Sequence, residues 1–254
     1  MGGWTTVPSG GYYVEIWDGA GKRVPRVIGG YHSGGDPGFW TPKGRNTQHV
    51  NSVALGPDQR IYLHILDYGA IRVYDRTKNG LDGCLYSAAH NHALGGSLPR
   101  CLAANRMGAL YLCTSTKQIL KLVDTGKELR TAYCSEPEPR MILPTGLSVS
   151  GDLIWVAANG PGDPFWDSGN GEEVLLFWDN GEEIQLVEQY GKAGTGRDKL
   201  EFMNPSATAQ SGNHLELWVA EDGMANPEGP SGNARVRRFK ITSSESEEAV
   251  FNLK

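Results

Sequence analysis

Long apolar runs are missing from this chain of 254 residues. No stretch of about 18 apolar residues occurs, which excludes a membrane-spanning helix. Residues 1–11 also lack the charged start and the apolar stretch of a signal peptide. We therefore expect a soluble protein that has no membrane partner, and its compartment stays open.

An excess of positive charge is missing too, because 24 Lys and Arg residues stand against 29 Asp and Glu residues. The net charge of −5 disfavours binding to a phosphate backbone. A basic cluster near the C-terminus is followed by an acidic one: Arg235, Arg237, Arg238 and Lys240, then Glu245, Glu247 and Glu248. Side chains alternate along a strand, so we expect cross-strand ion pairs here and no nucleic-acid partner.

Cysteine is scarce, and the four present show no C-x-x-C spacing for zinc or redox chemistry. Cys101 and Cys113 would face each other if the chain turned at residues 105–108. A cross-strand disulfide is one alternative, and buried free thiols are the interpretation we favour, because cysteine is often found inside proteins. The other two cysteines are Cys84 and Cys134.

Glycine and proline are plentiful, with 34 and 14 residues, while 39% of the chain is hydrophobic. Both residue types favour turns and disfavour helix interiors. The composition therefore predicts an all-β protein with many turns.

A hairpin pattern recurs along the chain. Each copy is an aromatic or aliphatic strand that ends in Asp, then a polar turn and a second strand. The Asp residues recur roughly every 50 residues, at Asp18, Asp75, Asp124 and Asp179. A fifth copy over residues 235–254 lacks the Asp. A further pair of short strands precedes each of the last four copies.

Four strands in roughly 50 residues are typical of a β-propeller blade. We predict one propeller domain over residues 1–254, with blades over residues 12–30 (partial), 47–97, 98–142, 143–201 and 202–254. The first strand of each full blade lies innermost and alternates small residues, among them Gly146 and Ala207. If Ala207 packs at the axis, Ala207→Leu should overpack the centre.

The first blade differs from the others, because residues 12–30 form only an outer hairpin, with strands over 12–18 and 23–28. Residues 1–11 can supply one short strand at most, and the last blade has four strands of its own. We expect four full four-stranded blades plus this half-blade, in a five- or six-bladed ring that is incomplete in this chain; a self-sufficient five-bladed ring is the alternative. Exposed edges then favour self-association, or an N-terminal segment or partner that is missing from this chain.

One blade resembles the NHL repeat. It has a Gly-rich lead-in, Phe202, Pro205, the strand "LWVAED" and the strand "NARVRRF" in the same order as that family. Pro99 and Pro144 match Pro205 in two other blades, and Val50 replaces it in the first full blade. The resemblance covers roughly residues 40 to 254 and implies a propeller.

The resemblance leaves function open, because propellers of this kind include binding modules, lyases and hydrolases. Our leading hypothesis is a binding or interaction module, part of a larger protein or assembly, with a protein, glycan or small molecule as ligand. The alternative is an amidating-lyase-like or lactonase-like enzyme with a metal at the mouth of the central channel.

Candidate ligand-binding residues lie where loops meet this mouth. Long segments at 31–49, 159–173 and 221–235 combine Gly, Pro and Asp with aromatic residues. Our candidates are Trp40, His49, Asn51, Asp67, Arg100, Asn159, Trp166 and Asp222. Alternatively, the aromatic residues hold the loops to the rim, and the polar residues bind channel water and cap strand ends.

A metal site is the weaker hypothesis. Amidating lyases hold zinc with histidines from several blades, and here only His49 stands at the start of an inner strand. His90 and His92 form an i, i+2 pair without a clear third ligand, and ordinary loop histidines explain them. Asn51, Asn159 and Asp222 could hold calcium as lactonase-like propellers do, but the Glu that those propellers use has no clear counterpart here.

Overall fold

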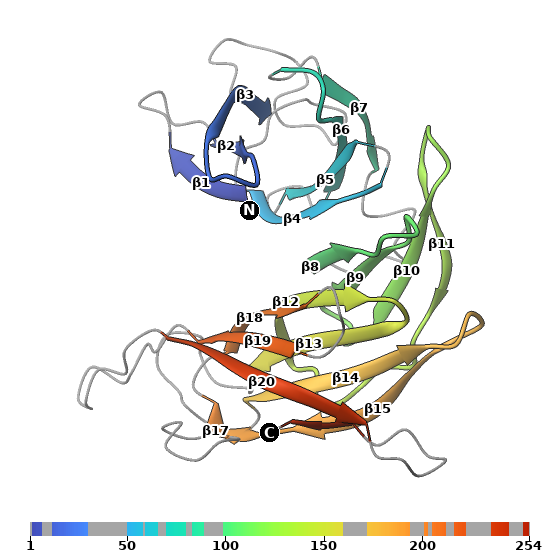
Figure 1. The fold of residues 1–254 in the computed structure, drawn as a ribbon. Coiled ribbons are helices and arrows are strands. Elements are labelled where there is room, and N and C mark those ends of the chain that lie inside the picture. The colour runs from blue at the N-terminus through green and yellow to red at the C-terminus, as the bar shows by residue number, and fades with distance from the viewer. Residues whose placement is uncertain are drawn as a thin grey trace. The chain divides into compact units, whose positions relative to one another are not determined.

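The computed structural model describes residues 2–6, 12–29, 50–57, 59–65, 70–79, 83–88, 99–159, 172–193, 201–202, 205–211, 216–221, 235–243 and 251–253. These residues form mainly antiparallel sheets (Figure 1) and include no helical element. None of them belongs to a helix long and apolar enough to cross a membrane. The chain divides into two compact units: unit 1 holds residues 1–110 and 121–132, and unit 2 holds residues 111–120 and 133–254.

The N-terminal sheet has three strands in the order β1 (Gly2–Thr6), β2 (Tyr12–Trp17) and β3 (Arg23–Gly29). The predicted hairpin and the single short strand before it are therefore both confirmed. The carboxylate of Asp18 closes the hairpin turn, since its Oδ1 accepts the backbone N–H groups of Ala20 at 3.0 Å and Lys22 at 2.8 Å.

Four sheets of four strands follow, each with its strands in chain order. Blade one consists of β4 (Val50–Leu55), β5 (Arg60–Ile65), β6 (Ala70–Asp75) and β7 (Cys84–Ala88). Blade two consists of β8 (Pro99–Ala104), β9 (Leu110–Thr114), β10 (Ile119–Asp124) and β11 (Leu129–Cys134). Blade three consists of β12 (Leu143–Ser150), β13 (Leu153–Asn159), β14 (Glu173–Asp179) and β15 (Ile184–Tyr190). Blade four consists of β18 (Pro205–Gln210), β19 (Glu216–Glu221), β20 (Arg235–Ser243) and β21 (Phe251–Leu253).

One short parallel pair was not expected from the sequence. Strand β16 (Lys192–Ala193) pairs with β17 (Glu201–Phe202) between blades three and four in the chain. This pair positions Phe202, which is fully buried in the core of unit 2. The Gly-rich lead-in of the NHL-like blade therefore ends in a core residue.

The recurring Asp residues begin the turns between the third and fourth strands. Asp124 and Asp179 each accept a backbone N–H two residues later, from Gly126 at 2.7 Å and Gly181 at 2.9 Å. Both glycines have positive φ, 92° and 95°. Glycine adopts this conformation without a steric penalty, which explains the Asp-x-Gly spacing.

Each unit has its own apolar core. In unit 1, Val14 of the N-terminal sheet packs against Ile61, Leu63, Ile65 and Tyr74 of blade one. In unit 2, the core joins blades three and four and contains Trp155, Val174, Leu176, Tyr190, Phe202, Leu217, Val219, Phe239 and Ile241. Burial of these large side chains is the main source of stability at both places.

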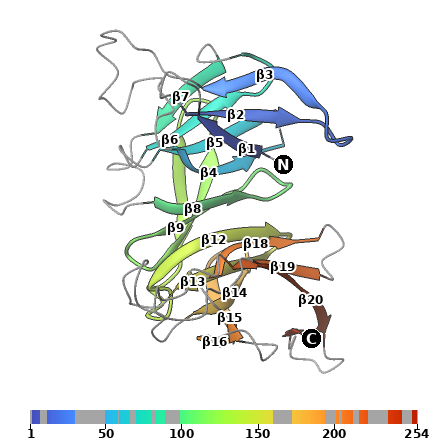
Figure 2. The same cartoon turned by 90° about the vertical axis from the view of Figure 1, so that its left-hand side faces the viewer.

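The inner strands of unit 2, β12 and β18, lie side by side (Figure 2). A Cβ atom added at Gly146 would stand 2.4 Å from the Cα of Ala207, so the close approach needs glycine. The side chain of Ala207 is exposed, however. Our expectation that Ala207→Leu overpacks the centre is therefore wrong, because the close contact involves the backbone of Ala207 and not its methyl group.

The cysteines and the basic cluster follow the predictions in part. All four cysteines are free; Cys101 and Cys113 are buried, Cys84 is half-buried and Cys134 is exposed. The basic residues do form cross-strand ion pairs, but with Glu221 and Glu216 of β19. The acidic residues that we expected as partners, 245–248, lie outside the described residues.

Candidate functional site

Three of the eight predicted ligand-binding residues belong to the described part of the chain. Asn51 and Arg100 lie at the starts of inner strands in unit 1, and Asn159 ends β13 in unit 2. The other five lie outside the described residues: Trp40, His49, Asp67, Trp166 and Asp222. The histidine pair His90 and His92 lies outside them as well. Ligand binding by these residues stays a prediction.

In unit 1 the structure brings Asn51 and Arg100 together. The Nδ2 group of Asn51 donates to the backbone carbonyl of Arg100 at 2.5 Å and lies 3.4 Å from Nδ1 of His64. One residue further, Ser52 Oγ accepts the backbone N–H of Leu102 at 3.2 Å. The start of β4 is therefore joined to β8 of the next blade by side-chain hydrogen bonds, which fix the two inner strands against each other.

The same kind of hydrogen bond between inner strands occurs in unit 2 at Thr145, which is aligned with Asn51 in the sequence repeat. Its Oγ1 donates to the carbonyl of Pro205 at 2.5 Å, so β12 is joined to β18 of the next blade. Further along the same strands, Ser148 Oγ hydrogen-bonds to Thr208 Oγ1 at 3.1 Å. Polar residues at the start of the inner strands thus hold adjacent blades together in both units.

The long segment of residues 222–234 begins and ends at a buried ion-pair cluster. Glu221 is only 2% exposed. Its carboxylate accepts one hydrogen bond from Arg235 Nη2 at 2.8 Å and another from Arg237 Nε at 2.5 Å. Glu221 and Arg235 are also backbone partners across β19 and β20, and the hydrogen bond from Arg235 to Glu221 raises the pKa of this guanidinium above its ordinary value. The base of the segment is therefore closed by charge-assisted hydrogen bonds.

Different residues flank the segment of residues 160–171. Asn159 ends β13, and its buried Oδ1 has no hydrogen-bond partner among the described residues. Glu173 begins β14, and burial raises the pKa of its carboxyl group above the ordinary value, although the nearby Arg140 guanidinium opposes this shift. Glu173 pairs with Ala158 across the two strands, so the alternation of side chains places Glu173 and Asn159 on opposite faces of the sheet, and the two groups do not form one site.

Two tyrosines of one blade share one Asp of the next, and the sequence analysis missed this. In unit 1, Tyr62 of β5 donates to Asp124 Oδ2 at 2.9 Å, and Tyr86 of β7 donates to Oδ1. Arg60 forms an ion pair with the same carboxylate. Burial alone would raise the pKa of Asp124, but the hydrogen bonds from Arg60, Tyr86, Gly126 and Tyr62 outweigh it and lower the pKa.

The same bridge recurs in unit 2. Tyr111 of β9 donates to Asp179 Oδ2 at 2.6 Å, and Tyr133 of β11 donates to Oδ1. Asp179 is 3% exposed. The available sequence signal was a Tyr in the second and fourth strands of the blade that precedes each of these two Asp residues. The recurring Asp thus has two roles, as a turn cap and as a bridge between blades.

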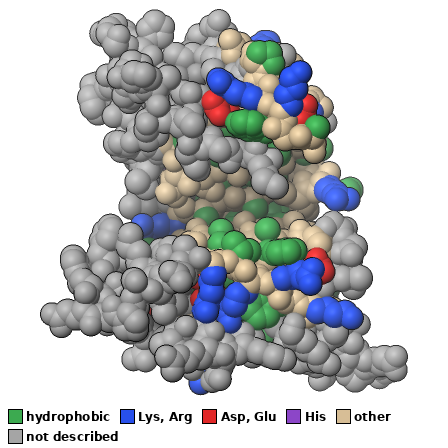
Figure 3. Space-filling model, turned by 60° about the vertical axis from the view of Figure 1, so that its left-hand side comes forward, with side chains coloured by type: hydrophobic (Ala, Val, Ile, Leu, Met, Phe, Trp, Pro, Cys, Tyr) green, Lys and Arg blue, Asp and Glu red, His purple; other side chains and the backbone are tan. Residues whose placement is uncertain are grey.

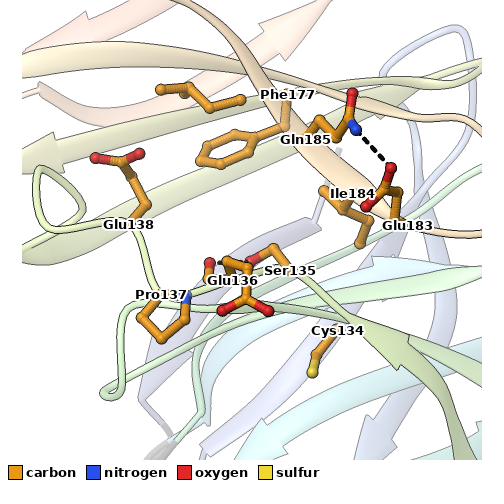
Figure 4. Close-up of a pocket in the computed structure, with 10 residues that line it drawn as sticks. Cys134, Ser135, Glu136, Pro137, Glu138, Phe177, Glu183, Ile184 and Gln185 are labelled. Atoms are coloured by element: carbon orange, nitrogen blue, oxygen red, sulfur yellow. Dashed lines mark hydrogen bonds between the residues drawn. The ribbon is translucent and has the colours of Figure 1, made fainter.

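A cleft of about 340 Å³ lies next to the second bridge, between the end of β11 and the hairpin of β14 and β15. Its lining combines carboxylates with apolar side chains: Cys134, Ser135, Glu136, Pro137, Glu138, Phe177, Glu183, Ile184, Gln185 and Leu186 (Figure 4). Gln185 Nε2 donates to Glu183 at 2.5 Å, and Arg140 forms an ion pair with Glu138 at 2.7 Å. The cleft lies on the outer strands, away from the predicted channel mouth.

A second cleft, of about 290 Å³, adjoins the first bridge in unit 1. It is lined by Pro57, Arg60, Tyr62, Met107, Gly108, Ala109, Val123 and Asp124. Its charged groups, Arg60 and Asp124, are already paired with each other. Across the described ranges, no three His, Cys, Asp or Glu side chains gather in a way that could hold a metal ion.

No protein-family model matches the sequence, and no curated protein matches it. Solved β-propeller structures do match the fold. A candidate 6-phosphogluconolactonase from Bacteroides uniformis is 15% identical with a TM-score of 0.56, and covers 99% of this chain and 66% of its own. The corresponding candidate from Bacteroides fragilis is 15% identical with a TM-score of 0.56, and covers 95% and 63%.

The β-propeller domain of Cps50 (Swd1) from Myceliophteria thermophila is 10% identical with a TM-score of 0.56, and covers 98% of this chain and 65% of its own. The chain thus spans about two thirds of the length of these three structures. At such low identity the comparison shows the fold alone: the chain is an all-β protein with a β-propeller fold.

Proposed function

We propose that this chain is an NHL-like β-propeller that works as a binding module, and that its long segments at one edge of the blades hold the ligand. The observation that carries this proposal is the buried ion-pair cluster at the base of residues 222–234. A buried charge cluster adds little net stability compared with apolar packing, but it fixes geometry. Fixed geometry at the base of a long segment is what a preorganised binding site needs.

The strand directions in unit 2 support this proposal. Hydrogen bonds between Thr145 and Pro205 and between Ser148 and Thr208 show that β12 and β18 run in the same direction. Strands β13 and β19 are antiparallel to them, so both end at the edge where β12 and β18 begin. The segments 160–171 and 222–234 therefore leave from the same edge of unit 2.

The composition of these segments indicates the class of ligand. Residues 160–171 include Phe165 and Trp166 among Gly, Pro and Asp, and residues 222–234 begin with Asp222. Aromatic rings offer flat surfaces for stacking, and Asp and Asn side chains offer hydrogen-bond acceptors and donors. A glycan, a peptide or a small polar molecule fits this chemistry.

Shortening the segments tests the proposal. Residues 161–171 or 223–233 are replaced by a short Gly-Ser turn, and each variant is compared with the wild-type chain on glycan and peptide arrays. We expect the wild-type chain to bind one class of probe and both variants to lose that binding. Lys127→Ser, in the exposed turn between β10 and β11, is the control. Binding that survives both replacements, or a wild-type chain that binds no probe, contradicts the proposal.

The second candidate function is a lactonase-like enzyme, which the similarity to two candidate 6-phosphogluconolactonases favours. Hydrolysis of 6-phosphogluconolactone by the purified chain, with and without added calcium, tests it directly. Under the binding-module proposal we expect no turnover above the background rate. Turnover that Asn159→Ala abolishes would favour the enzyme instead.

A further inference from the structure

One turn of unit 2 joins a bridge between blades to a chemically reactive sequence. The turn between β14 and β15 contains Asp179, Asn180 and Gly181 in succession. An Asn-Gly peptide can modify itself, because glycine has no side chain to keep its backbone nitrogen away from the preceding side chain. The sequence contains four Asn-Gly pairs, and this is the pair of which the structure describes both residues.

The self-modification of this pair uses only the chain itself and water. The backbone nitrogen of Gly181 loses its proton and forms a bond to Cγ of Asn180. The bond between Cγ and Nδ2 then breaks, and the amino group leaves as ammonia with a proton, which gives a cyclic succinimide. Water opens this ring at either carbonyl group. The product is aspartate, or isoaspartate, in which the main chain continues through the side chain.

The structure holds the attacking nitrogen of this reaction. The N–H group of Gly181 donates to Asp179 Oδ1 at 2.9 Å. The carboxylate of Asp179 is itself fixed, because it accepts hydrogen bonds from Tyr111 and Tyr133 of blade two. Loss of the proton would place a negative nitrogen beside this carboxylate, and a like charge at such a distance disfavours the charged form. Asp179 therefore slows the first step.

The side chain of Asn180 is held as well. Its Oδ1 accepts the backbone N–H groups of Glu182 and Glu183, each at 2.9 Å. Any rotation that brings Cγ into line with the attacking nitrogen works against these hydrogen bonds. The same N–H groups polarise the side-chain carbonyl, which favours attack. These two effects oppose each other, so the contact between Gly181 and Asp179 controls the reaction.

The charge of the turn acts in the same direction as this contact. Residues 178–184 include the carboxylates of Asp179, Glu182 and Glu183 and no Lys or Arg. Asp152 lies nearby, because its backbone carbonyl accepts the N–H of Asp179 at 2.9 Å. Elsewhere on the described surface, Lys and Arg side chains lie next to hydrophobic ones (Figure 3). The turn therefore has no cation of its own that could stabilise a deprotonated amide.

We propose that Asn180 is a site of spontaneous succinimide formation and deamidation, and that the bridge at Asp179 keeps it unmodified in the folded chain. Opening of the junction between blades two and three frees the N–H of Gly181 and starts the reaction. Because isoaspartate lengthens the main chain, the modification also changes the hairpin turn. This inference is independent of the proposed ligand site.

Mass spectrometry of peptides, after incubation of the full chain at mildly alkaline pH, measures the conversion of Asn180. Burial and the hydrogen bond to Asp179 raise the pKa of Tyr111, so the bridge keeps this donor under these conditions. We expect Asn180 to convert at least about tenfold more slowly in the folded wild-type chain than in denaturant, since a hydrogen bond to a charged acceptor must first break. Equal rates in the two conditions overturn the proposal.

A variant separates the effect of the bridge from that of folding in general. Asp179→Ala removes the acceptor of the Gly181 N–H group and should raise the rate in the folded chain about tenfold. Trp155→Ala is the control, because it should cost at least as much stability in the same blade while the turn stays unchanged. If Asp179→Ala does not fold by circular dichroism, Asp179→Asn, which removes the charge and keeps the size, replaces it. A rate at Asn180 that stays at the wild-type value in the Asp179 variant, or that rises equally in Trp155→Ala, overturns the proposal.

Discussion

The two blade junctions of unit 2 use the same strands and different chemistry. Between blades two and three, Tyr111 and Tyr133 donate their hydroxyl groups to Asp179. Between blades three and four, Trp155 and Tyr190 pack at a ring-centre distance of 5.7 Å in an apolar cluster. In both junctions the second and fourth strands of the earlier blade supply the aromatic residues.

The difference lies in the later blade. Blade three ends its third strand with Asp179, whereas β20 of blade four contributes Phe239 and Ile241 to the cluster. Within unit 2, the junction at which the later blade carries the Asp is a polar bridge, and the junction at which the later blade lacks it is apolar. A polar bridge fixes the relative position of two sheets through directional bonds, while apolar packing contributes more burial free energy.

We expect the largest loss of stability for a substitution at the apolar junction. Trp155 is fully buried, so Trp155→Ala leaves a large cavity and should lower the free energy of unfolding by about 3–5 kcal/mol. Chemical denaturation monitored by circular dichroism measures this change. Trp178→Ala, at a 44% exposed position of the same blade, should cost much less. Equal losses in the two variants would show that the cluster is not the centre of this junction.

Breaking the polar bridge should lower the free energy of unfolding somewhat less than the change at Trp155. Asp179→Ala removes a buried acceptor and leaves two tyrosine hydroxyl groups without it, which should cost about 2–4 kcal/mol. The control is Asp18→Ala, because Asp18 caps an equivalent turn but is exposed, and we expect a loss of about 1 kcal/mol or less there. If denaturant titrations show the same loss of unfolding free energy for both variants, Asp179 acts only as a turn cap.

The inner strands of unit 2 provide a steric test. Gly146→Ala places a Cβ atom against the backbone of Ala207 and should cost about 1–3 kcal/mol, because backbone atoms cannot move aside easily. Gly19→Ala, with no heavy atom within 4 Å of the added Cβ, is the control and should leave the melting temperature nearly unchanged. An unchanged melting temperature for Gly146→Ala would contradict the close approach of β12 and β18.

Acid should weaken the polar bridge at Asp124. The folded pKa of Asp124 lies below the ordinary value of 3.8, so its ionised form stabilises the fold at higher pH. This contribution is lost as the pH falls below that value through the folded pKa. Relative to Asp124→Asn, the wild-type chain should therefore lose stability in this acidic range. A constant difference between the two proteins from neutral to acidic pH would argue against the bridge.

The sequence predicted the blades well, because their signals are local. The Asp-x-Gly turns and the alternating strands lie within a few residues of each other, and the N-terminal hairpin with its single extra strand followed from the same pattern. The bridges were not predicted, because they join residues of different blades, such as Tyr111 and Asp179. The ion pair between Arg237 and Glu221 was not predicted for a similar reason, because it joins β20 to β19, while the sequence analysis considered only the acidic residues that follow in the chain.

The candidate site was predicted only in part. Among the candidates, the structure brings Asn51 and Arg100 together at the starts of two inner strands, and their role in ligand binding stays a prediction. The alignment could not show that Asn51 donates to a backbone carbonyl of the next blade, because that contact depends on how two sheets pack. It also could not show which side of β18 Ala207 faces.

The bridge between Tyr111 and Asp179 is tested most directly by a double-mutant cycle. Tyr111→Phe, Asp179→Ala and the double variant are compared with the wild-type chain by denaturant titration. The bridge predicts a coupling of about 1 kcal/mol or more, because each single change already removes the shared hydrogen bond. Additivity of the two single losses, to within about 0.3 kcal/mol, would contradict it.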